Sequence, residues 1–518
     1  MDRMEPVDLN AAAADAYAAA PLLNCLLREA AEPAGEPGVH RLRGSGRLLR
    51  VSGGRRPAHP ELLTERGWHP LGGAGLVKVV SDELLRYTGV SNDELPSEIA
   101  DSRDAVAALL AARAHARPPA DPYLLSEQSL VMGHPHHPAP KARGGAPAAS
   151  WLPYAPEAHA RFPLVFLGLR EDQLAEEGGP AVAGALDSLA DALDGPRAPA
   201  GYRLLPAHPW QLELVGARRE VREAFADGRL LRLGPSRLPA WPTAAIRTLY
   251  VQDAAADLFV KFSLDVRITN DVRRLWRHDL QRLRRTDGAV EAGFDELRRS
   301  GSNAAWLADR GYRTAAFAFE ELAVLVRDGL RARVEPGAVA LLAAALAEGF
   351  PGSPLAPART VDPAAWWRAY LRHVVPPVLE LFARHGIVLE AHLQNTLVAV
   401  DAEGMPVQAL FRDAEGVKLP GDLSRAAAWQ RLVYCLVVNH LAEVGGALAE
   451  RYPDMMARVW PAVRAEFRRY EAERGGLPEI AELLAGPALP AKTNLLLRWT
   501  RADGADARYL PLPNPLRE

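Results

Sequence analysis

Lys261 lies in a short apolar segment whose alternation separates a cation from an aliphatic face. If residues 258–264, Leu-Phe-Val-Lys-Phe-Ser-Leu, form a strand, every second side chain shares a face. The aliphatic face then consists of Leu258, Val260, Phe262 and Leu264, and Lys261 projects from the other side. A lysine on such a face can simply reach solvent, but it can also line a cleft and hold a phosphate.

The residues before this segment favour the cleft. Arg247-Thr-Leu-Tyr-Val251 precedes a turn at residues 252–257, so the two segments are predicted to form an antiparallel hairpin. Lysine is also scarce, because only five of the 61 basic residues are Lys. An ammonium group is a compact point charge and arginine a planar fork, so a retained lysine suits contact with one phosphate or carboxylate oxygen.

A candidate carboxylate site follows the hairpin at Ile268-Thr-Asn-Asp-Val-Arg273. Thr269 or Asn270 could cap a new helix, with Thr269 and Arg273 four residues apart. A helix N-terminus offers free amide donors, and Arg273 adds a two-pronged donor for a carboxylate. A capped helix with solvated arginines is the alternative.

A second constellation occupies residues 387–413. If Ile387–Asn395 is a strand, Glu390, His392 and Gln394 share one face, and a second hairpin is predicted at 396–400 and 407–413. Asn395 and Asp413, at opposite ends of that hairpin, carry the oxygen ligands that Mg²⁺ prefers. A His-x-x-Asn sequence followed by Asp also occurs in kinase-type phosphotransferases, but these have a catalytic Asp in the loop where this chain has Leu393 and Gln394.

The loop Gly133–Gly145 combines three histidines with Lys141 and Arg143. The histidines could bind zinc or nickel, but no carboxylate or thiol is nearby and the two cations would repel a metal. Phosphate binding suits the lysine, the arginine and the glycines better, and a structural Pro/His loop is the third possibility. His208, before Trp210, is predicted to fix a turn.

The elements that must position these residues indicate a mixed α+β protein. Short strands are predicted at 164–169 and 230–233, and helices at 315–350, 364–385 and 429–451. Residues 1–130 are predicted to form helices interrupted by a hairpin or loop at Gly44–Arg56. The Pro/Gly/His-rich loop 133–153 marks a domain boundary.

Composition narrows the functional classes. A net charge of −3 with 24% charged residues favours neither nucleic acid nor an anionic membrane as a partner. Acidic residues interrupt the Ala-rich N-terminus, and no apolar stretch of membrane length follows, so we expect a cytoplasmic protein. Cys25 and Cys435 belong to no CxxC pair and are expected to be buried thiols.

Seven of these segments, taken together and in order, resemble the IucA/IucC family of siderophore synthetases. The matching segments are Gly133-His-Pro-His-His-Pro-Ala-Pro-Lys-Ala-Arg-Gly, Pro206-Ala-His-Pro-Trp-Gln, Arg247-Thr with Lys261-Phe-Ser, Ile268-Thr-Asn with Arg273, His392-Leu-Gln-Asn, Arg412-Asp and Pro513-Asn-Pro-Leu. They span residues 133 to 516. Any one of them alone would be weak evidence, but seven in sequence are specific.

The resemblance implies a cupped-hand α+β architecture: a thumb (1–142), fingers of mixed or antiparallel β-structure with helices that bind ATP (143–335), and a mainly helical palm that carries the His-Leu-Gln-Asn hairpin (336–518). It also implies a reaction, in which a carboxylate such as citrate attacks the α-phosphate of ATP and an amine or hydroxylamine then displaces AMP. Small-molecule acids and amines are the implied partners, and we expect a homodimer.

The resemblance further implies roles for individual residues. ATP would be held by His134, Lys141, Arg143, Arg247, Thr248, Lys261, Glu390, Asn395 and Asp413. Mg²⁺ would be held by Glu390, Asn395 and Asp413, and the carboxylate substrate by Thr269, Arg273, His392 and Gln394. The residues expected to act in catalysis are Lys261, Arg247, His392 and Arg273.

Two departures from the family pattern stand out. Ala245 occupies a position where the family usually has Ser, and losing a hydrogen bond to a charged group costs about 1.5–3 kcal/mol. The region before Gly133 is also short for the family. The other functions considered are a kinase-like phosphotransferase, a non-siderophore carboxylate–amine ligase, and a ferric-reductase or siderophore-binding protein. The last would be expected to carry a cysteine cluster.

Overall fold

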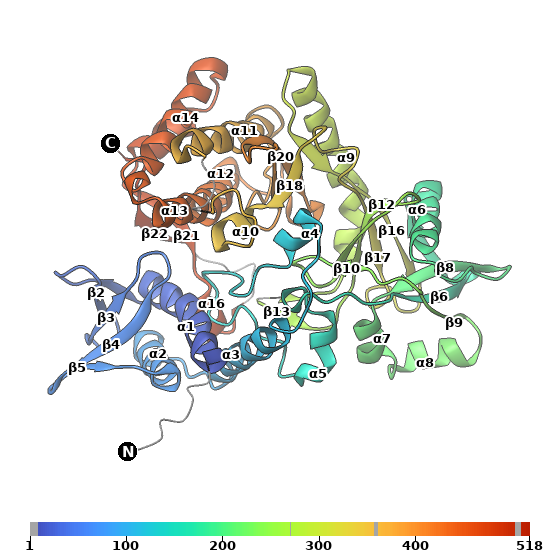
Figure 1. The fold of residues 1–518 in the computed structure, drawn as a ribbon, viewed down its shortest axis with the longest axis horizontal. Helices are drawn as coiled ribbons and strands as arrows, with labels where there is room; N and C mark the ends of the chain where they lie inside the picture. The colour runs from blue at the N-terminus through green and yellow to red at the C-terminus, as the bar shows by residue number, and fades with distance from the viewer. Residues whose placement is uncertain (1–8, 270, 357–360, 503–508, 518) are drawn as a thin grey trace.

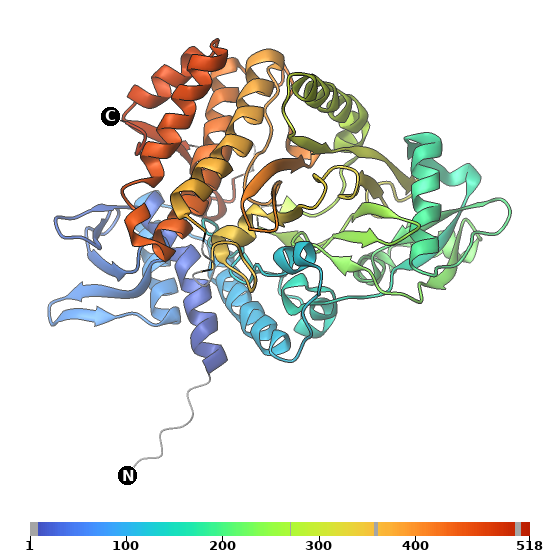
Figure 2. The same cartoon turned by 45° about the horizontal axis from the view of Figure 1, so that its top comes forward.

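The computed structural model describes residues 9–269, 271–356, 361–502 and 509–517. The N-terminal helices and sheet lie at one end, the strands of the middle of the chain at the other, and the helices of the last third above them (Figure 1). Figure 2 shows the C-terminal helices packed side by side. The mixture of antiparallel sheets and helices agrees with the predicted α+β class.

The N-terminal region contains a five-stranded antiparallel sheet in the order β1-β2-β3-β4-β5. The sequence predicted only a hairpin or loop here, because each strand is too short for a strong alternation signal. Glycines with positive φ, at Gly38, Gly46 and Gly53, form its turns. The elements are α1 (Leu9–Glu29), β1 (Ala31–Pro33), β2 (Val39–Leu42), β3 (Leu48–Ser52), β4 (Ala58–Thr64), β5 (Gly67–Pro70), α2 (Gly73–Thr88) and α3 (Glu94–Arg113).

The middle region is built on a six-stranded sheet, β10-β11-β12-β17-β16-β7, and a three-stranded sheet, β8-β6-β9. The aliphatic face of β12 packs into one hydrophobic core with α6 and the smaller sheet, which leaves Lys261 on the opposite face, as predicted. The strands are β6 (Val165–Arg170), β7 (Leu174–Glu177), β8 (Tyr202–Ala207), β9 (Leu230–Pro235), β10 (Trp241–Pro242), β11 (Thr248–Gln252), β12 (Asp257–Phe262), β16 (Asp309–Ala315) and β17 (Val324–Asp328). The helices are α4 (Pro122–Glu127), α5 (Ala148–Trp151), α6 (Gly179–Ala192), α7 (Pro209–Val215) and α8 (Arg219–Ala226).

The last third packs helices against a four-stranded sheet, β15-β20-β19-β18, in which β15 runs parallel to β20. The predicted hairpin at 396–413 is the central pair β19–β20. The strands are β15 (Ala305–Leu307), β18 (Val339–Leu342), β19 (Thr396–Val400), β20 (Pro406–Arg412), β21 (Ala488–Lys492) and β22 (Tyr509–Pro513). The helices are α9 (Arg277–Arg299), α10 (Ala343–Glu348), α11 (Pro363–His385), α12 (Arg425–Val433), α13 (Ala442–Arg451), α14 (Val459–Arg474), α15 (Pro478–Ala485) and α16 (Leu495–Trp499).

Three sequence predictions of secondary structure are wrong. Residues 315–350 contain the strands β17 and β18 and the short helix α10, joined by turns and loops, because apolar residues in short runs fit a buried strand as well as a helix. Residues 387–395 form a loop with one isolated bridge, from Val388 to Lys418. The helix start expected near Thr269 is a small hairpin of β13 (Arg267–Ile268) and β14 (Asp271–Val272), and the helix begins at Arg277. Asn270, the other candidate cap, lies outside the described residues.

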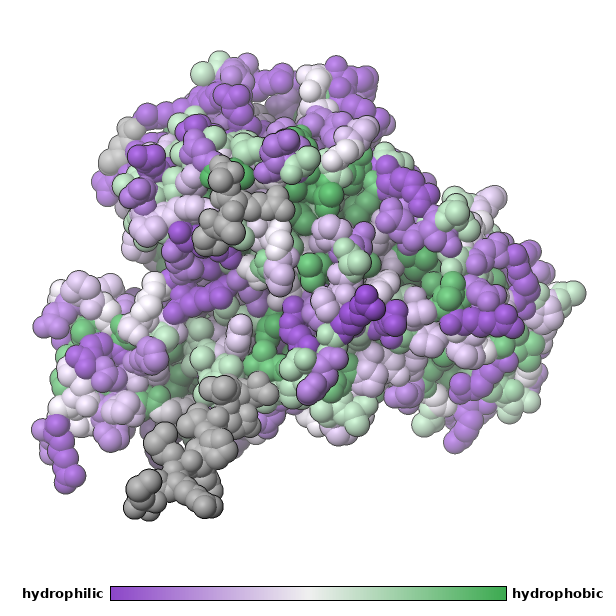
Figure 3. Space-filling model, viewed as in Figure 1, coloured by the Kyte–Doolittle hydropathy of each residue, from purple (hydrophilic) through white to green (hydrophobic). Residues whose placement is uncertain are grey.

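A continuous helical stretch at Arg425–Arg451 joins α12 and α13 through a π-helical segment, Tyr434–Leu441. It is long and apolar enough to cross a membrane, but 89% of its most apolar window is buried inside the protein. It is therefore the central helix of the C-terminal core, a role that requires the same apolar composition. Hydrophilic side chains cover much of the outer face in Figure 3.

Both cysteines, Cys25 and Cys435, are buried free thiols, as the sequence predicted. The domain boundaries near residues 142 and 335 stay a prediction. Helix α16 packs its Leu495 and Trp499 into the hydrophobic core of the N-terminal region. This helix therefore joins the C-terminal part of the chain to the N-terminal sheet and helices.

Candidate active site

Lys261 joins the two predicted hairpins. Its Nζ lies 2.9 Å from Oδ1 of Asp413 and 2.7 Å from Oε2 of Glu415, in the segment that follows β20. The lysine is only 4% exposed. A buried ammonium is stable only when opposite charges surround it. The two ion pairs of Lys261 therefore hold the β11–β12 hairpin against the end of the β19–β20 hairpin.

The β11–β12 register brings Thr248 and Arg247 to the same place. Thr248 lies directly opposite Lys261, so both side chains share a face. The Thr248 hydroxyl has no hydrogen-bond partner among the residues that the structure describes. Arg247 donates to the backbone carbonyls of Arg273 (2.7 Å) and Arg274 (3.1 Å) and lies 3.5 Å from Glu415.

The carboxylates of Asp413 and Glu415 are held in the ionised form. Burial would raise the pKa of Asp413, but Lys261 and Arg327 outweigh it and hold the pKa well below its ordinary value. Burial would also raise the pKa of Glu415, but Lys261 and Arg247 outweigh it and lower that pKa. Asp413 also has a positive φ of 81°, which turns the chain so that residues 413 and 415 both reach Lys261.

Arg327 and Asp309 complete this cluster, and both were missed in the sequence. Arg327 donates to Asp309 at 2.6 Å and lies 3.3 Å from Asp413. Asp309, fully buried, also accepts the backbone N–H of Ala414 at 3.1 Å. Phe259 faces Arg327 across the sheet, and Arg327 faces Asp309, so these residues share the face of Lys261. No local motif marks them, because only the strand order β12-β17-β16 makes them neighbours.

Thr269 and Arg273 do come together, but on the β13–β14 hairpin instead of a helix. Arg273 Nη2 donates to Oγ1 of Thr269 and to the carbonyl of Ile268, both at 2.6 Å. Burial and the neighbouring Arg247 lower the pKa of Arg273 to about 10. Two guanidinium groups close together favour an anion between or beside them, and the carboxylate contact of Arg273 stays a prediction.

His134 and His392 come from segments far apart in sequence and influence each other electrostatically. Burial is the main cause that lowers the pKa of each, and His392 contributes to the lowering at His134. Nδ1 of His134 accepts the N–H of His136, and Nδ1 of His392 accepts that of Gln394. Both rings therefore stay neutral, and neither Nε2 has a partner among the described residues, so each can bind a ligand.

The side chains of Lys141 and Arg143 point to a buried carboxylate of the protein. Both are buried and pair with Glu157, Arg143 at 3.1 Å. Burial would raise the pKa of Glu157, but the two cations outweigh it and lower the pKa. The side chain of Lys141 also runs directly beneath Gly133, whose φ is +78°. These contacts stabilise the Gly133–Gly145 loop, and the predicted role in ATP binding stays a prediction.

Of the predicted Mg²⁺ ligands, Asp413 lies in the central cluster and Glu390 pairs with Arg431. Asn395 is 8% exposed, and its side chain, like that of Gln394, has no hydrogen-bond partner in the described part of the chain. No group of three or more His, Cys, Asp or Glu side chains in that part is placed to hold a metal. Mg²⁺ needs only one or two carboxylates beside phosphate oxygens and waters, so Asp413 and Glu415 fit it.

Arg412, next to Asp413, ties the cluster to helix α4. It lies 2.7 Å from Glu127 and donates to the Tyr123 hydroxyl at 3.0 Å and to the Gln394 carbonyl at 2.8 Å. Glu127 in turn accepts the N–H of Ala244. These buried bonds fix the position of the end of β20. They therefore also fix the positions of Asp413 and Glu415, which follow it.

The site thus gathers several cations around two ionised carboxylates, bordered by polar groups without protein partners. Such an arrangement can hold a polyphosphate with its metal ion and a carboxylate substrate close together, which brings two mutually repelling anions into reach. The fold and the site define the class of enzyme that activates a carboxylate with a nucleotide.

Solved structures share this fold. The ATP-bound aerobactin synthetase IucA from Klebsiella pneumoniae is 23% identical and superposes with a TM-score of 0.82 over 97% of this chain and 99% of its own. The petrobactin biosynthesis protein AsbB from Bacillus anthracis is 17% identical, with a TM-score of 0.79 over 98% and 96%. At this identity the likeness concerns the fold, and it confirms the predicted architecture.

The family follows from the sequence matches. Residues 122–348 match the model of the IucA / IucC family. The L-2,3-diaminopropanoate–citrate ligase of Staphylococcus aureus is 30% identical over 76% of this chain and 75% of its own length. The spermidine–citrate ligase of Bacillus anthracis is 24% identical over 76% and 73%. The chain belongs to the IucA/IucC family, which confirms the resemblance.

The C-terminal part matches a second model. Residues 364–507 match that of the ferric iron reductase FhuF-like transporters. This region holds the helical core around α11 to α14, and Cys435 within it is a buried thiol. The matched range also contains the β19–β20 hairpin and the two carboxylates, Asp413 and Glu415, that contact Lys261.

Proposed function

We propose that this protein is an ATP-dependent siderophore synthetase. It activates a carboxylate by adenylation and joins it to an amine or hydroxylamine, forming an amide and releasing AMP and pyrophosphate. The observation that carries the proposal is the position of Lys261 between Asp413 and Glu415, with Arg247 and Arg327 adjoining. This cluster suits a nucleotide phosphate chain better than a small neutral ligand.

Citrate or a related di- or tricarboxylic acid is the proposed acid. The relatives from Staphylococcus aureus and Bacillus anthracis are named as citrate ligases, although they differ in the amine. In this chain we assign the acid to Thr269, Arg273, His392 and Gln394. Arg273 supplies the planar donor that a carboxylate accepts best.

The residues of the chain have separate tasks in this reaction. Lys261, Arg247 and Thr248 bind phosphate oxygens and offset the charge that grows at the α-phosphate. Arg273 and Thr269 orient the acid so that one carboxylate oxygen faces that phosphorus, and His134 donates to the nucleotide through Nε2. Mg²⁺, when bound by Asp413 and Glu415 with Asn395 or Glu390 beside them, would offset phosphate charge.

A phosphotransferase is the main rival, because ATP binding alone does not select the reaction. The loop between His392 and Asn395 contains Leu393 and Gln394, neither of which can accept a hydroxyl proton as a kinase Asp does. The products decide between the two. With ATP, Mg²⁺ and citrate, the ligase gives AMP and pyrophosphate, and hydroxylamine traps a citryl hydroxamate. Formation of ADP alone would overturn the ligase.

A ferric reductase or siderophore-binding function ranks last. Cys25 and Cys435 are the chain's two cysteines, and they lie in different hydrophobic cores, so they cannot share an iron–sulfur cluster. A non-siderophore carboxylate–amine ligase would give the same nucleotide products. The acid and amine accepted in the trapping assay would distinguish it.

We further propose a cytoplasmic homodimer that acts on small molecules and binds neither membrane nor nucleic acid. The net charge of −3 and the burial of the apolar helix at Arg425–Arg451 support the expectation that it binds neither membrane nor nucleic acid. Light scattering of the purified protein would report the dimer.

A further inference from the structure

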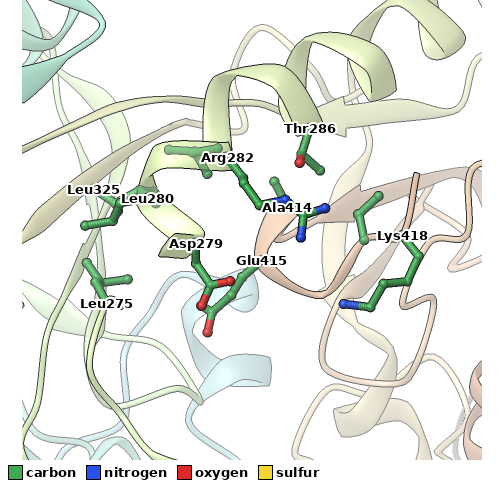
Figure 4. Close-up of a pocket in the computed structure, with 11 residues that line it drawn as sticks. Leu275, Asp279, Leu280, Arg282, Thr286, Leu325, Ala414, Glu415 and Lys418 are labelled. Atoms are coloured by element: carbon green, nitrogen blue, oxygen red, sulfur yellow. The ribbon is translucent and has the colours of Figure 1, made fainter. Parts of the chain in front are cut away.

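A small pocket adjoins the Lys261 cluster, between the first turns of α9 and the segment after Asp413 (Figure 4). Its volume is about 40 Å³. Glu415 belongs to the Lys261 cluster and to the pocket. One of its carboxylate oxygens contacts Lys261, and its side chain also lines the pocket. A molecule in the pocket would therefore lie next to the groups proposed to hold the nucleotide phosphates at which the acid is activated.

The pocket carries both signs of charge on opposite sides. The carboxylates of Asp279 and Glu415 lie side by side, and Lys418 extends its amine towards the pocket from the other side (Figure 4). The backbone of Lys418 is fixed by two hydrogen bonds to Val388, and its amine has no ion pair among the described residues. Arg282, which also lines the pocket, is already paired with Asp422 at 2.8 Å.

The hydroxyl of a largely buried threonine also lines the pocket. Thr286 is 5% exposed, and its side chain makes no hydrogen bond within the described residues. Figure 4 shows it on α9 above Ala414. A hydroxyl in this position can donate a hydrogen bond to a molecule in the pocket or accept one from it. The remaining walls are apolar and include Leu275, Leu280 and Val417.

We propose that this pocket binds the amine co-substrate, and that the amine carries a carboxylate close to its ammonium group. This inference rests on the proposed ligase function. The ammonium lies against Asp279 and Glu415, the carboxylate pairs with Lys418, and Thr286 hydrogen-bonds either group. A water needs about 10–15 Å³, so the pocket holds a compact head group. A short diamino acid fits these features, and a long polyamine such as spermidine does not.

The wild-type enzyme tests this with pairs of amines that differ only in a carboxylate. L-2,3-diaminopropanoate is compared with 1,2-diaminoethane, and L-ornithine with 1,4-diaminobutane, using citrate, ATP and Mg²⁺. The carboxylate-bearing member of at least one pair is expected to have the higher kcat/KM, by about tenfold or more. Turnover of neither pair, or preference for the carboxylate-free members, would overturn the proposal.

Two variants test which charged side chain of the pocket binds which group of the amine. Lys418→Gln is expected to lower kcat/KM for the carboxylate-bearing amine by about tenfold or more and to leave its carboxylate-free partner unchanged. Asp279→Asn is expected to weaken both amines, because both carry the ammonium. Lys78→Gln, at an exposed position of α2, is the matched control. Equal effects of Lys418→Gln on both amines would contradict the assignment.

Hydroxylamine trapping separates this proposal from the ligase function. The citryl hydroxamate forms without the amine co-substrate, so its rate and the KM for citrate should be unchanged in Lys418→Gln, which also shows that the variant is folded. If the wild type forms no hydroxamate, the ligase function fails. If trapping is normal but Lys418→Gln raises the KM for citrate and not for the amine, the pocket binds the acid and the amine proposal fails.

Discussion

Nζ of Lys261 lies 2.7 Å from Oε2 of Glu415, and the two residues are 154 positions apart in sequence. The lysine comes from the sheet of the middle region and the glutamate from the turn that follows β20. The contact crosses between two hydrophobic cores, so it places the face of the middle sheet that carries Lys261 against the two carboxylates that follow β20. The predictions below depend on this junction.

Replacing Lys261 tests the centre of the site. Lys261→Ala should lower kcat for citrate-dependent pyrophosphate release by about 100–1000-fold, because removing one donor aimed at developing charge has that effect. Every acid should be affected alike. Lys78→Ala, at an exposed position, is the control. Near-normal turnover in a folded Lys261→Ala enzyme would remove the lysine from the phosphate site.

Arg273 should act mainly on the acid. Arg273→Ala is expected to raise the KM for citrate by about tenfold or more, since a hydrogen bond to a charged group is worth about 1.5–3 kcal/mol. The KM for ATP should change less. Arg285→Ala on the exposed side of α9 serves for comparison, and initial rates over a grid of both substrates measure the two constants. An unchanged citrate KM would place the carboxylate elsewhere.

Asp413 should determine the requirement for Mg²⁺. Asp413→Asn keeps the size of the side chain but loses the charge, so the Mg²⁺ concentration for half-maximal pyrophosphate release should rise by about tenfold or more. Glu403→Gln, in the exposed turn at the other end of the same hairpin, should behave as wild type. The same Mg²⁺ dependence in all three proteins would exclude Asp413 as a ligand.

The buried pair Asp309–Arg327 should contribute to stability as well as to the site. Asp309→Asn removes the nearer of the two carboxylates that face the buried Arg327 guanidinium and should lower the free energy of unfolding by about 3 kcal/mol. The exposed pair Arg298–Asp295 provides the control, since Asp295→Asn should cost about 1 kcal/mol or less. Urea unfolding measures both, and a loss no larger for Asp309→Asn than for Asp295→Asn would contradict the prediction.

Asp287 should make stability depend on pH. Burial, with Asp309 beside it, raises its pKa from 3.8 to about 7, so the folded state binds this proton more tightly than the unfolded chain. The stabilisation is complete below about pH 4 and is lost as the pH rises to about 7. Its full size is at most about 4 kcal/mol, at 1.36 kcal/mol per pKa unit.

Asp287→Asn should remove this dependence. The amide oxygen can still accept the bonds from Trp306 and from the Asp309 backbone, which lie at 2.7 and 2.8 Å, but the side chain no longer titrates. Urea unfolding of both proteins at pH 4.5 and 7.5 gives the difference, in which the other carboxylates cancel. The wild type should lose more stability than the variant over this range, and equal losses would show that Asp287 does not titrate there.

The sequence predicted the site best where function depends on local alternation. The hairpin of β11 and β12 and the position of Lys261 opposite an aliphatic face followed from period-two patterning alone. The hairpin of β19 and β20 was predicted on the same basis. The segment at Thr269–Arg273 was placed on the wrong element, because a helix N-terminus and a tight hairpin share the same polar residues and only the packing around Arg247 distinguishes them.

Lys261, Arg247, Thr248 and Asp413 were thus determined as candidates by the sequence itself, through residue type, spacing and ordered motifs. The tertiary structure decided which charges meet: Glu415 with Lys261, Arg327 with Asp413, and Lys141 and Arg143 with Glu157 instead of with the central cluster. The physical reason is that strand alternation is a local property of the chain, whereas ion pairs depend on the order of strands in a sheet and on the burial that makes an unpaired charge costly.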